Sequence, residues 1–250
     1  MLINTVILFL QNILPTLVVA TILLILLKEG SKKWLFHGIG LAVPVLIIQT
    51  YCSQYLSELF SGLGLEILYA CGYLLIYLAL LLLVLSQHQH TQATKQRLLA
   101  SVSLLLVFSL NSTSFSWYLL NYINQVNALD SLLLGLTLGA GIGLSFAILL
   151  YFFLDWARAH IHAQAPVICL FLFAAGQLIQ GIKLLAQVDL WPITPLLFNS
   201  GELLPAQSVL ASLFSVLLGY HARITQLNAV IYIVAFVLPI ILIKRNKHEI

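Results

Sequence analysis

The chain has 250 residues, of which 61% are hydrophobic and 8% are charged, and its formal net charge is +3. Because a soluble domain carries about 25% charged residues, this composition cannot cover a surface that faces water. It excludes a soluble enzyme, a nucleic-acid-binding domain and a disordered chain. The cysteines Cys52, Cys71 and Cys169 lie in or beside apolar runs without a CxxC spacing, so they indicate neither a disulfide framework nor a zinc site.

Seven apolar stretches are long enough to cross a bilayer, whose hydrocarbon core of about 30 Å requires roughly 20 helical residues. They cover residues 4–27, 34–55, 64–86, 98–122, 131–153, 165–187 and 227–243. No alternation of the outer-membrane barrel type occurs, and a backbone in lipid must satisfy its own hydrogen bonds. The sequence therefore predicts an all-α fold, in which residues 1–250 form a single transmembrane domain, a bundle of seven transmembrane helices.

The basic residues predict the orientation of this bundle, because cytoplasmic loops are rich in lysine and arginine. No basic residue precedes the first span, which argues against a secretory signal peptide. Nine of the eleven lysines and arginines fall on one side of the seven-span arrangement: Lys28, Lys32, Lys33, Lys95, Arg97, Arg158, Lys244, Arg245 and Lys247. This asymmetry predicts an N-out/C-in topology, whereas six spans would leave a basic loop or tail outside.

The longest connection between predicted spans covers residues 188–226. Residues 208–218 within it place apolar side chains at helical spacing. This pattern predicts an outer amphipathic helix before the last span, lying against the membrane surface or dipping into it.

Polar residues inside the spans are the first functional candidates, because they are costly in lipid. In the first span, Gln11 and Asn12 precede Pro15, which cannot donate a backbone hydrogen bond and clashes with the carbonyl of Gln11. This stretch is either a coordination or permeation point or a packing kink whose amides bond to neighbouring helices. The packing kink is the more frequent case, because many membrane helices tolerate proline.

The fourth span holds a dense group of small polar residues. They are Ser109, Asn111, Ser112, Thr113, Ser114 and Ser116. Such a group either lines a polar path or forms interhelical hydrogen bonds, which contribute about 0.6 kcal/mol each on average. The sequence does not decide between these two interpretations.

The fifth and sixth spans carry residues that favour packing and anchoring. Gly135, Gly139, Gly141 and Gly143 contain two overlapping GxxxG spacings, which predict close contact with another helix. The sixth span contains Gln177, Gln180 and Lys183. Lys183 lies near the outer end of that span, where its long side chain can reach the interface.

Two His-x-His pairs lie in predicted inner loops, His88 with His90 and His160 with His162. Imidazoles are common metal ligands, so two pairs that face each other would be able to hold a transition metal on the inner side. A solvated loop is the more frequent explanation of such short tracts. No nucleotide-binding loop, catalytic triad or HExxH motif is present, so no residue supports enzymatic chemistry.

Several motifs in the C-terminal third resemble a known transporter family. The sequence reads Ala-Ala-Gly-Gln-Leu-Ile-Gln-Gly-Ile over 174–182, Trp-Pro at 191–192, Glu-Leu-Leu-Pro-Ala-Gln-Ser-Val-Leu over 202–210 and Leu-Leu-Gly-Tyr-His-Ala-Arg-Ile-Thr over 217–225. This run resembles the closing segment of the high-affinity iron permease family, the oxidase-linked ferric iron transporters, which reads LLPxDSLLG…LLGYxARPS. The number of spans, the N-out orientation and the small residues of the fifth span also fit that family.

The resemblance implies where a transport path lies. In the family, an Arg-Glu-Gly-x-Glu motif in the first and fourth spans supplies carboxylates to ferric iron, and these paired motifs imply two repeated triplets of spans. The corresponding stretches here, 11–15 and 109–113, contain no carboxylate, and Glu66 at the start of the third span is the one acid that matches a family position. The implied path residues are Gln11, Asn12, Pro15, Glu66, Ser109, Asn111 and Thr113.

The function implied by the resemblance is transport of iron or a related metal cation across a bacterial inner (plasma) membrane, without a resident cofactor. A periplasmic or extracellular iron-binding protein or oxidase is the implied partner, together with assembly into a homo- or hetero-oligomer. The alternative is a non-transporting structural or regulatory subunit of a transport complex. That alternative arises because neutral amides and hydroxyls compensate little of the charge of a trivalent ion.

Overall fold

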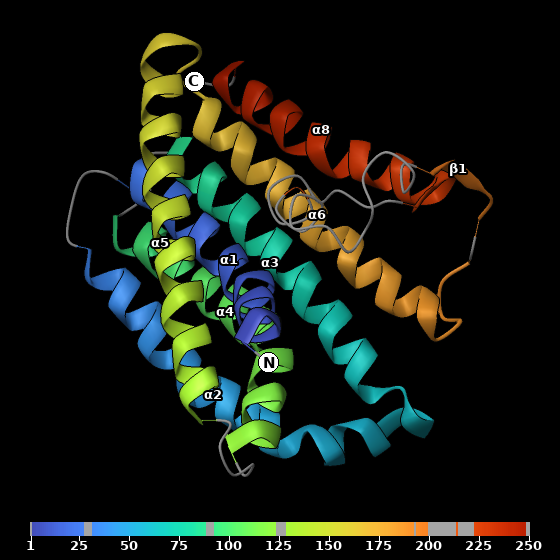
Figure 1. Cartoon of the computed structure of the whole chain (residues 1–250). Coiled ribbons are helices and arrows are strands. Elements are labelled where there is room, and N and C mark those ends of the chain that lie inside the picture. The colour runs from blue at the N-terminus through green and yellow to red at the C-terminus, as the bar shows by residue number, and fades with distance from the viewer. Residues whose placement is uncertain are drawn as a thin grey trace.

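The computed structural model describes residues 2–27, 32–88, 93–123, 129–192, 194–199, 214 and 223–248. Its long helices are α1 (Leu2–Leu26), α2 (Lys33–Glu58), α3 (Gly64–His88), α4 (Ala93–Ile123), α5 (Leu129–His160), α6 (Ala165–Gln187) and α8 (Gln226–His248) (Figure 1). A short 3-10 helix, η1 (Leu59–Gly62), joins α2 to α3. Two strands, β1 (Leu196–Asn199) and β2 (Arg223–Thr225), pair antiparallel before α8.

Seven of the described helices are long and apolar enough to cross a membrane, in agreement with the predicted spans. The match is closest for α6, which covers the predicted residues 165–187. The predicted amphipathic helix over 208–218 lies outside the described residues, apart from Phe214. The β1–β2 pairing was not predicted, because its two short strands are separated by a long stretch of chain and show no clear alternation.

The helix α5 extends well past the predicted end of its span at residue 153 and reaches His160. The side chain of Arg158 in this extension donates from Nη1 to the carbonyl oxygen of Ile25 at 3.1 Å. The last carbonyls of a helix have no intrahelical donor, and a cation is favourable near them. The extension therefore caps the C-terminal end of α1, which a scale of hydrophobicity alone cannot predict.

The predicted glycine packing is confirmed at the contact between α1 and α5, which run parallel. A Cβ atom placed on Gly135 would lie 2.7 Å from the Cβ of Thr5, and one on Gly139 would lie 2.9 Å from a ring carbon of Phe9. Gly143 lies against Leu17 in the same way. Since these glycines are four residues apart, they form one face of α5 that lets the two backbones approach closely.

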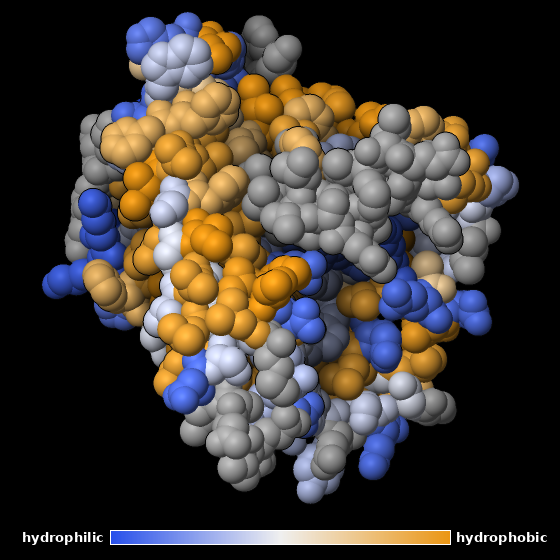
Figure 2. All heavy atoms as spheres, in the orientation of Figure 1, coloured by the Kyte–Doolittle hydropathy of each residue, from blue (hydrophilic) through white to orange (hydrophobic). Residues whose placement is uncertain are grey.

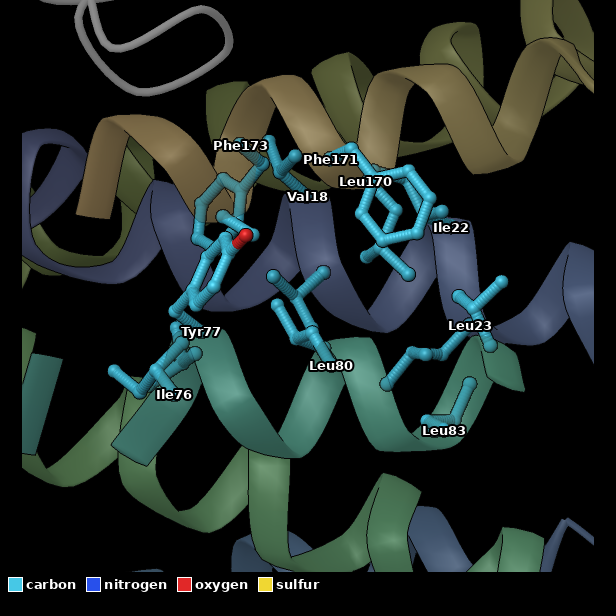
Figure 3. Packing of buried hydrophobic residues seen from close by; sticks show 14 of the residues in the cluster. Val18, Ile22, Leu23, Ile76, Tyr77, Leu80, Leu83, Leu170, Phe171 and Phe173 are labelled. Carbon is cyan, nitrogen blue, oxygen red and sulfur yellow. The ribbon is translucent and has the colours of Figure 1, made fainter. Parts of the chain in front are cut away.

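The core lies between α1, α3 and α6, as Figure 3 shows. Its fully buried side chains include Val18, Ile22 and Leu23 from α1, Leu80 and Leu83 from α3, and Leu170 and Phe171 from α6. The outer faces are also apolar: large side chains such as Leu149, Phe152 and Ile241 are exposed, and Figure 2 shows apolar atoms along α5 and α8. A bundle that is apolar both inside and outside belongs in a lipid bilayer, so the chain is an integral membrane protein.

The packing pattern repeats between the first three helices and the next three. The most extensive contacts join α1 with α5, α2 with α4 and α3 with α6. Helices α1, α2 and α3 of the first triplet correspond to α4, α5 and α6 of the second. Under this correspondence the α1–α5 contact is equivalent to the α4–α2 contact, and the α3–α6 contact is equivalent to itself. Among the remaining contacts, α2–α3 is equivalent to α5–α6, and α3–α4 is equivalent to the less extensive α6–α1 contact. Because α1 and α4 run in opposite directions, the two triplets have the arrangement of an inverted repeat.

The helix α8 lies outside both triplets and packs on α6 and α3. Pro239 within α8 has no N–H and cannot donate to the carbonyl of Ala235, four residues earlier. The hydroxyl of Tyr77 on α3 donates to that carbonyl oxygen at 2.9 Å. A side chain of the triplet core thus satisfies the backbone group that the proline leaves without its usual donor.

This bond predicts that substitutions at Tyr77 and Pro239 have coupled effects on the free energy of unfolding. We expect Tyr77→Phe to lower the free energy of unfolding by about 1 kcal/mol, because the buried carbonyl loses its donor. In a Pro239→Ala background the restored N–H can donate to Ala235, so the same substitution is expected to cost less. Thermal unfolding of the parent, both single variants and the double variant in detergent forms the double-mutant cycle. An equal cost of Tyr77→Phe in both backgrounds would contradict the assignment.

Candidate functional site

The helices α1 and α4 face each other along one stripe of each helix. The hydroxyls of Thr5 and Tyr118 are hydrogen-bonded at 2.7 Å, and the rings of Phe9 and Phe115 meet edge to face with centroids 5.6 Å apart. Each step toward the C-terminus of α1 is therefore matched by a step toward the N-terminus of α4. One turn beyond Phe9, this register places Asn12 opposite Asn111. The polar stretches of the first and fourth spans thus lie side by side.

The glycine contacts of the two triplets show which residues of α1 and α4 are equivalent. Gly135 of α5 packs on Thr5 and on the carbonyl oxygen of Leu2, three residues before Thr5. Gly38 of α2 packs on Leu104 and on the carbonyl oxygen of Ser101, three residues before Leu104. Thr5 therefore corresponds to Leu104, and the two are 99 positions apart (5 and 104). At these two glycines, the contact of α2 with α4 resembles that of α5 with α1.

The same spacing relates Asn12 to Asn111 (12 and 111). The two side chains also make the same bond: Nδ2 of Asn12 donates to the carbonyl of Leu8 at 2.7 Å, and Nδ2 of Asn111 donates to the carbonyl of Val107 at 2.9 Å. Asn12 and Asn111 are therefore equivalent in the repeat and also opposite each other. A residue pair with both properties lies at the pseudo-two-fold axis that relates the two triplets.

A third amide joins this pair from α6. Gln177 is almost completely buried, with 1% of its surface exposed, and its Oε1 lies 3.4 Å from Nδ2 of Asn111. Gln177 lies near the middle of α6 and was not among the predicted path residues. The sequence carries a signal for it, a glutamine inside an apolar span, but does not show that α6 meets α4 at Asn111. We call Asn12, Asn111 and Gln177 the central amides.

Within the described part of the chain, two buried hydroxyls of α1 and α4 have no hydrogen-bond partner, Oγ1 of Thr16 and Oγ of Ser112. Thr16 follows Asn12 by one turn of α1, and Ser112 is the neighbour of Asn111; their exposed fractions are 4% and 2%. The predicted path residues Ser109 and Thr113 instead donate to carbonyls of their own helix at 3.2 and 2.8 Å. Thr16 thus places an unsatisfied hydroxyl one turn from the repeat axis, as far as the described residues show.

The remaining predicted path residues differ in their surroundings. Pro15 is buried within a continuous α1, whereas Gln11 is exposed. Glu66 lies in the first turn of α3, and its Oε2 is buried without a hydrogen-bond partner among the described residues. Gly72 of α3 packs on Leu110, so Glu66 lies about 8 Å further along the helix axis than Asn111. The carboxylate is therefore near the central amides but not among them.

Of the four candidate metal-binding histidines, the structure describes the side chains of His160 and His162. His160 stacks on Trp156 with ring centroids 5.5 Å apart, and Nδ1 of His162 accepts a hydrogen bond from the backbone N–H of Gln164. The side chain of His88 and the whole of His90 lie outside the described residues. Within the described part of the chain, no cluster of three or more His, Cys, Asp or Glu side chains is able to hold a metal ion.

Comparisons with known proteins assign no family to this chain. No protein-family model matches it, and neither the curated proteins nor the solved structures give a match. The geometry of the repeat axis is therefore the main basis for a functional interpretation, beside the motif resemblance of the C-terminal third.

Proposed function

We propose that this chain is a membrane permease whose solute path passes between the two triplets at the central amides. The main support is that Asn12 and Asn111 are both equivalent and opposite, which places them at the axis of an inverted repeat. In transporters built from inverted repeats, the substrate site lies near the bilayer midplane at the repeat interface. Polar side chains at membrane depth are costly and typically mark a substrate path.

The cargo supported by the motif resemblance is iron or a related metal cation, carried across a bacterial inner membrane. A periplasmic or extracellular iron-binding protein or an oxidase would then deliver the ion. The proposed path contains Gln11, Asn12, Pro15, Glu66, Ser109, Asn111 and Thr113. Because the central amides are neutral, charge compensation for a metal ion has to come from Glu66 or from a partner subunit.

A second candidate is a non-transporting structural or regulatory subunit of a transport complex. It is favoured by one observation: all charged side chains of α1, α3, α4 and α6 lie near helix ends, namely Glu66, Lys95, Arg97 and Lys183. A chain that has lost its ion ligands can keep the fold and the assembly surface of a permease.

Uptake measurements separate the two candidates. If the chain, expressed alone in a host without other iron permeases, increases accumulation of radioactive iron, and Asn12→Ala with Asn111→Ala removes the increase, the chain is itself the permease. Thr137→Ala is the matched control, because Thr137 is exposed on α5 and bonds only within its own helix. If iron accumulates only when a partner protein is co-expressed, and equally with the double variant, the subunit role is the correct one.

The charge asymmetry of the loops predicts the orientation in the membrane. Reporter fusions at the C-terminus and in the segment between α6 and α8 are expected to report opposite sides, with the C-terminus inside. The reason is that α8 has to cross the bilayer between the two fusion points. Both reporters on one side would refute the topology with seven spans.

A further inference from the structure

The chemical character of the repeat axis points to a class of solute. We infer that the central amides, with the hydroxyl of Thr16 one turn from Asn12, recognise a small uncharged solute that carries both hydrogen-bond donors and acceptors, such as an amide, urea or polyol. This inference rests on the proposed permease function, and it takes the cargo from the site instead of from the motif resemblance.

The functional groups at the axis have no formal charge and offer both hydrogen-bonding roles. A side-chain amide presents two N–H donors and a carbonyl acceptor, and a hydroxyl donates one bond and accepts others. Multivalent cations are held in proteins by carboxylates, thiolates or imidazoles, or by cages of many oxygen ligands. A neutral solute needs no compensating charge when it leaves water, so it is the class that this set of groups can bind.

The hydrogen bonds of the site show that it has unused capacity. Oγ1 of Thr16, one turn from Asn12 on α1, is buried without a partner in the described part of the chain, and buried polar groups in native proteins are rarely left in that state. The bond from Asn111 to Gln177 is long at 3.4 Å, whereas the bonds of Asn12 and Asn111 to their own helices are 2.7 and 2.9 Å. A bound solute can supply a partner to the Thr16 hydroxyl and replace the long amide contact.

The symmetry of the site is compatible with solute binding while the two triplets move against each other during transport. Asn12 belongs to the first triplet and Asn111 to the second, and each side chain is half-buried and anchored to a carbonyl of its own helix. A solute bound between them can stay in contact with one amide of each triplet when one triplet moves against the other. Gln177 breaks this symmetry, since the α6 residue adds a third amide on one side only.

The test uses the purified full chain in liposomes and stopped-flow light scattering with urea, acetamide and glycerol as probes. We expect permeability to at least one probe to rise several-fold over empty liposomes. Asn111→Leu and Gln177→Leu are expected to lower it about tenfold, the factor for removal of one buried hydrogen-bond partner. If Gln177→Leu does not fold, Asn12→Ala provides the same test, because the Asn12 side chain is only half-buried. Thr137→Ala is expected to retain the full rate.

Parallel measurements with K⁺ and Fe²⁺ in the same liposomes distinguish the possible failures. Ion flux without solute flux would overturn the neutral-solute assignment and leave the permease function standing. Solute flux that none of the three amide variants lowers would move the path away from the central amides. If neither a solute nor an ion moves through protein that shows a cooperative unfolding transition, both this inference and the proposed permease function are wrong.

Discussion

Purified protein in liposomes is expected to carry Fe³⁺ poorly or not at all on its own. At an effective dielectric constant of about 20, a carboxylate about 4 Å from a unit positive charge contributes roughly 4 kcal/mol. Several such contributions, larger for a trivalent ion, are needed to offset the cost of dehydration. Asn12, Asn111 and Gln177 supply none of them, and no carboxylate lies in the middle of α1, α3, α4 or α6.

The repeat shows where carboxylates would have to be added. Asn12 and Asn111 are opposite and equivalent, so Asn12→Glu with Asn111→Glu places one carboxylate in each triplet at the axis. We expect this double variant to transport iron measurably faster than the parent, in a radioactive uptake assay. Asn12→Gln with Asn111→Gln is the matched control, because it adds the same length without charge. Robust ferric transport by the parent protein would show that carboxylates at the axis are dispensable.

The spans were predictable from the sequence because lipid imposes a simple requirement on each helix separately. Long apolar runs must form helices there, and the predicted ranges match the observed helices. The GxxxG prediction for α5 succeeded for a similar reason, since close packing needs small residues at fixed spacing on one face. It did not identify α1 as the partner, because a spacing within one helix carries no information about the helix opposite.

The candidate site was only partly predictable. The sequence marked Asn12 and Asn111 as polar residues in apolar spans, and the motif resemblance placed Leu110 at the position that corresponds to Asn12. The packing of Gly38 and Gly135 shifts this correspondence by one residue and pairs Asn12 with Asn111. A shift of one position turns a helical side chain by about 100°. Only the helix contacts could show that the two asparagines are opposite each other in register and that Gln177 contacts Asn111.

Gly135→Val is expected to be the most damaging single substitution in the contact between α1 and α5, which holds Asn12 in place. A Cβ atom at Gly135 would already lie 2.7 Å from Thr5, so the branched side chain of valine must push α1 and α5 apart. Overpacking of this kind costs about 1–3 kcal/mol and at times more. Displacement of α1 also moves Asn12 away from Asn111, so solute flux through the central amides is expected to fall together with stability.

Gly141→Val is the matched control for this substitution, because a Cβ atom at Gly141 has no neighbour within 4 Å. Both changes replace a glycine of α5 with the same residue, so their effects on helix propensity cancel in the comparison. We expect the Gly141 variant to unfold near the temperature of the parent in detergent and to keep its solute flux. If both variants unfold at the same temperature, α5 does not pack on α1 through its glycine face, and the equivalence of Asn12 with Asn111 loses its structural basis.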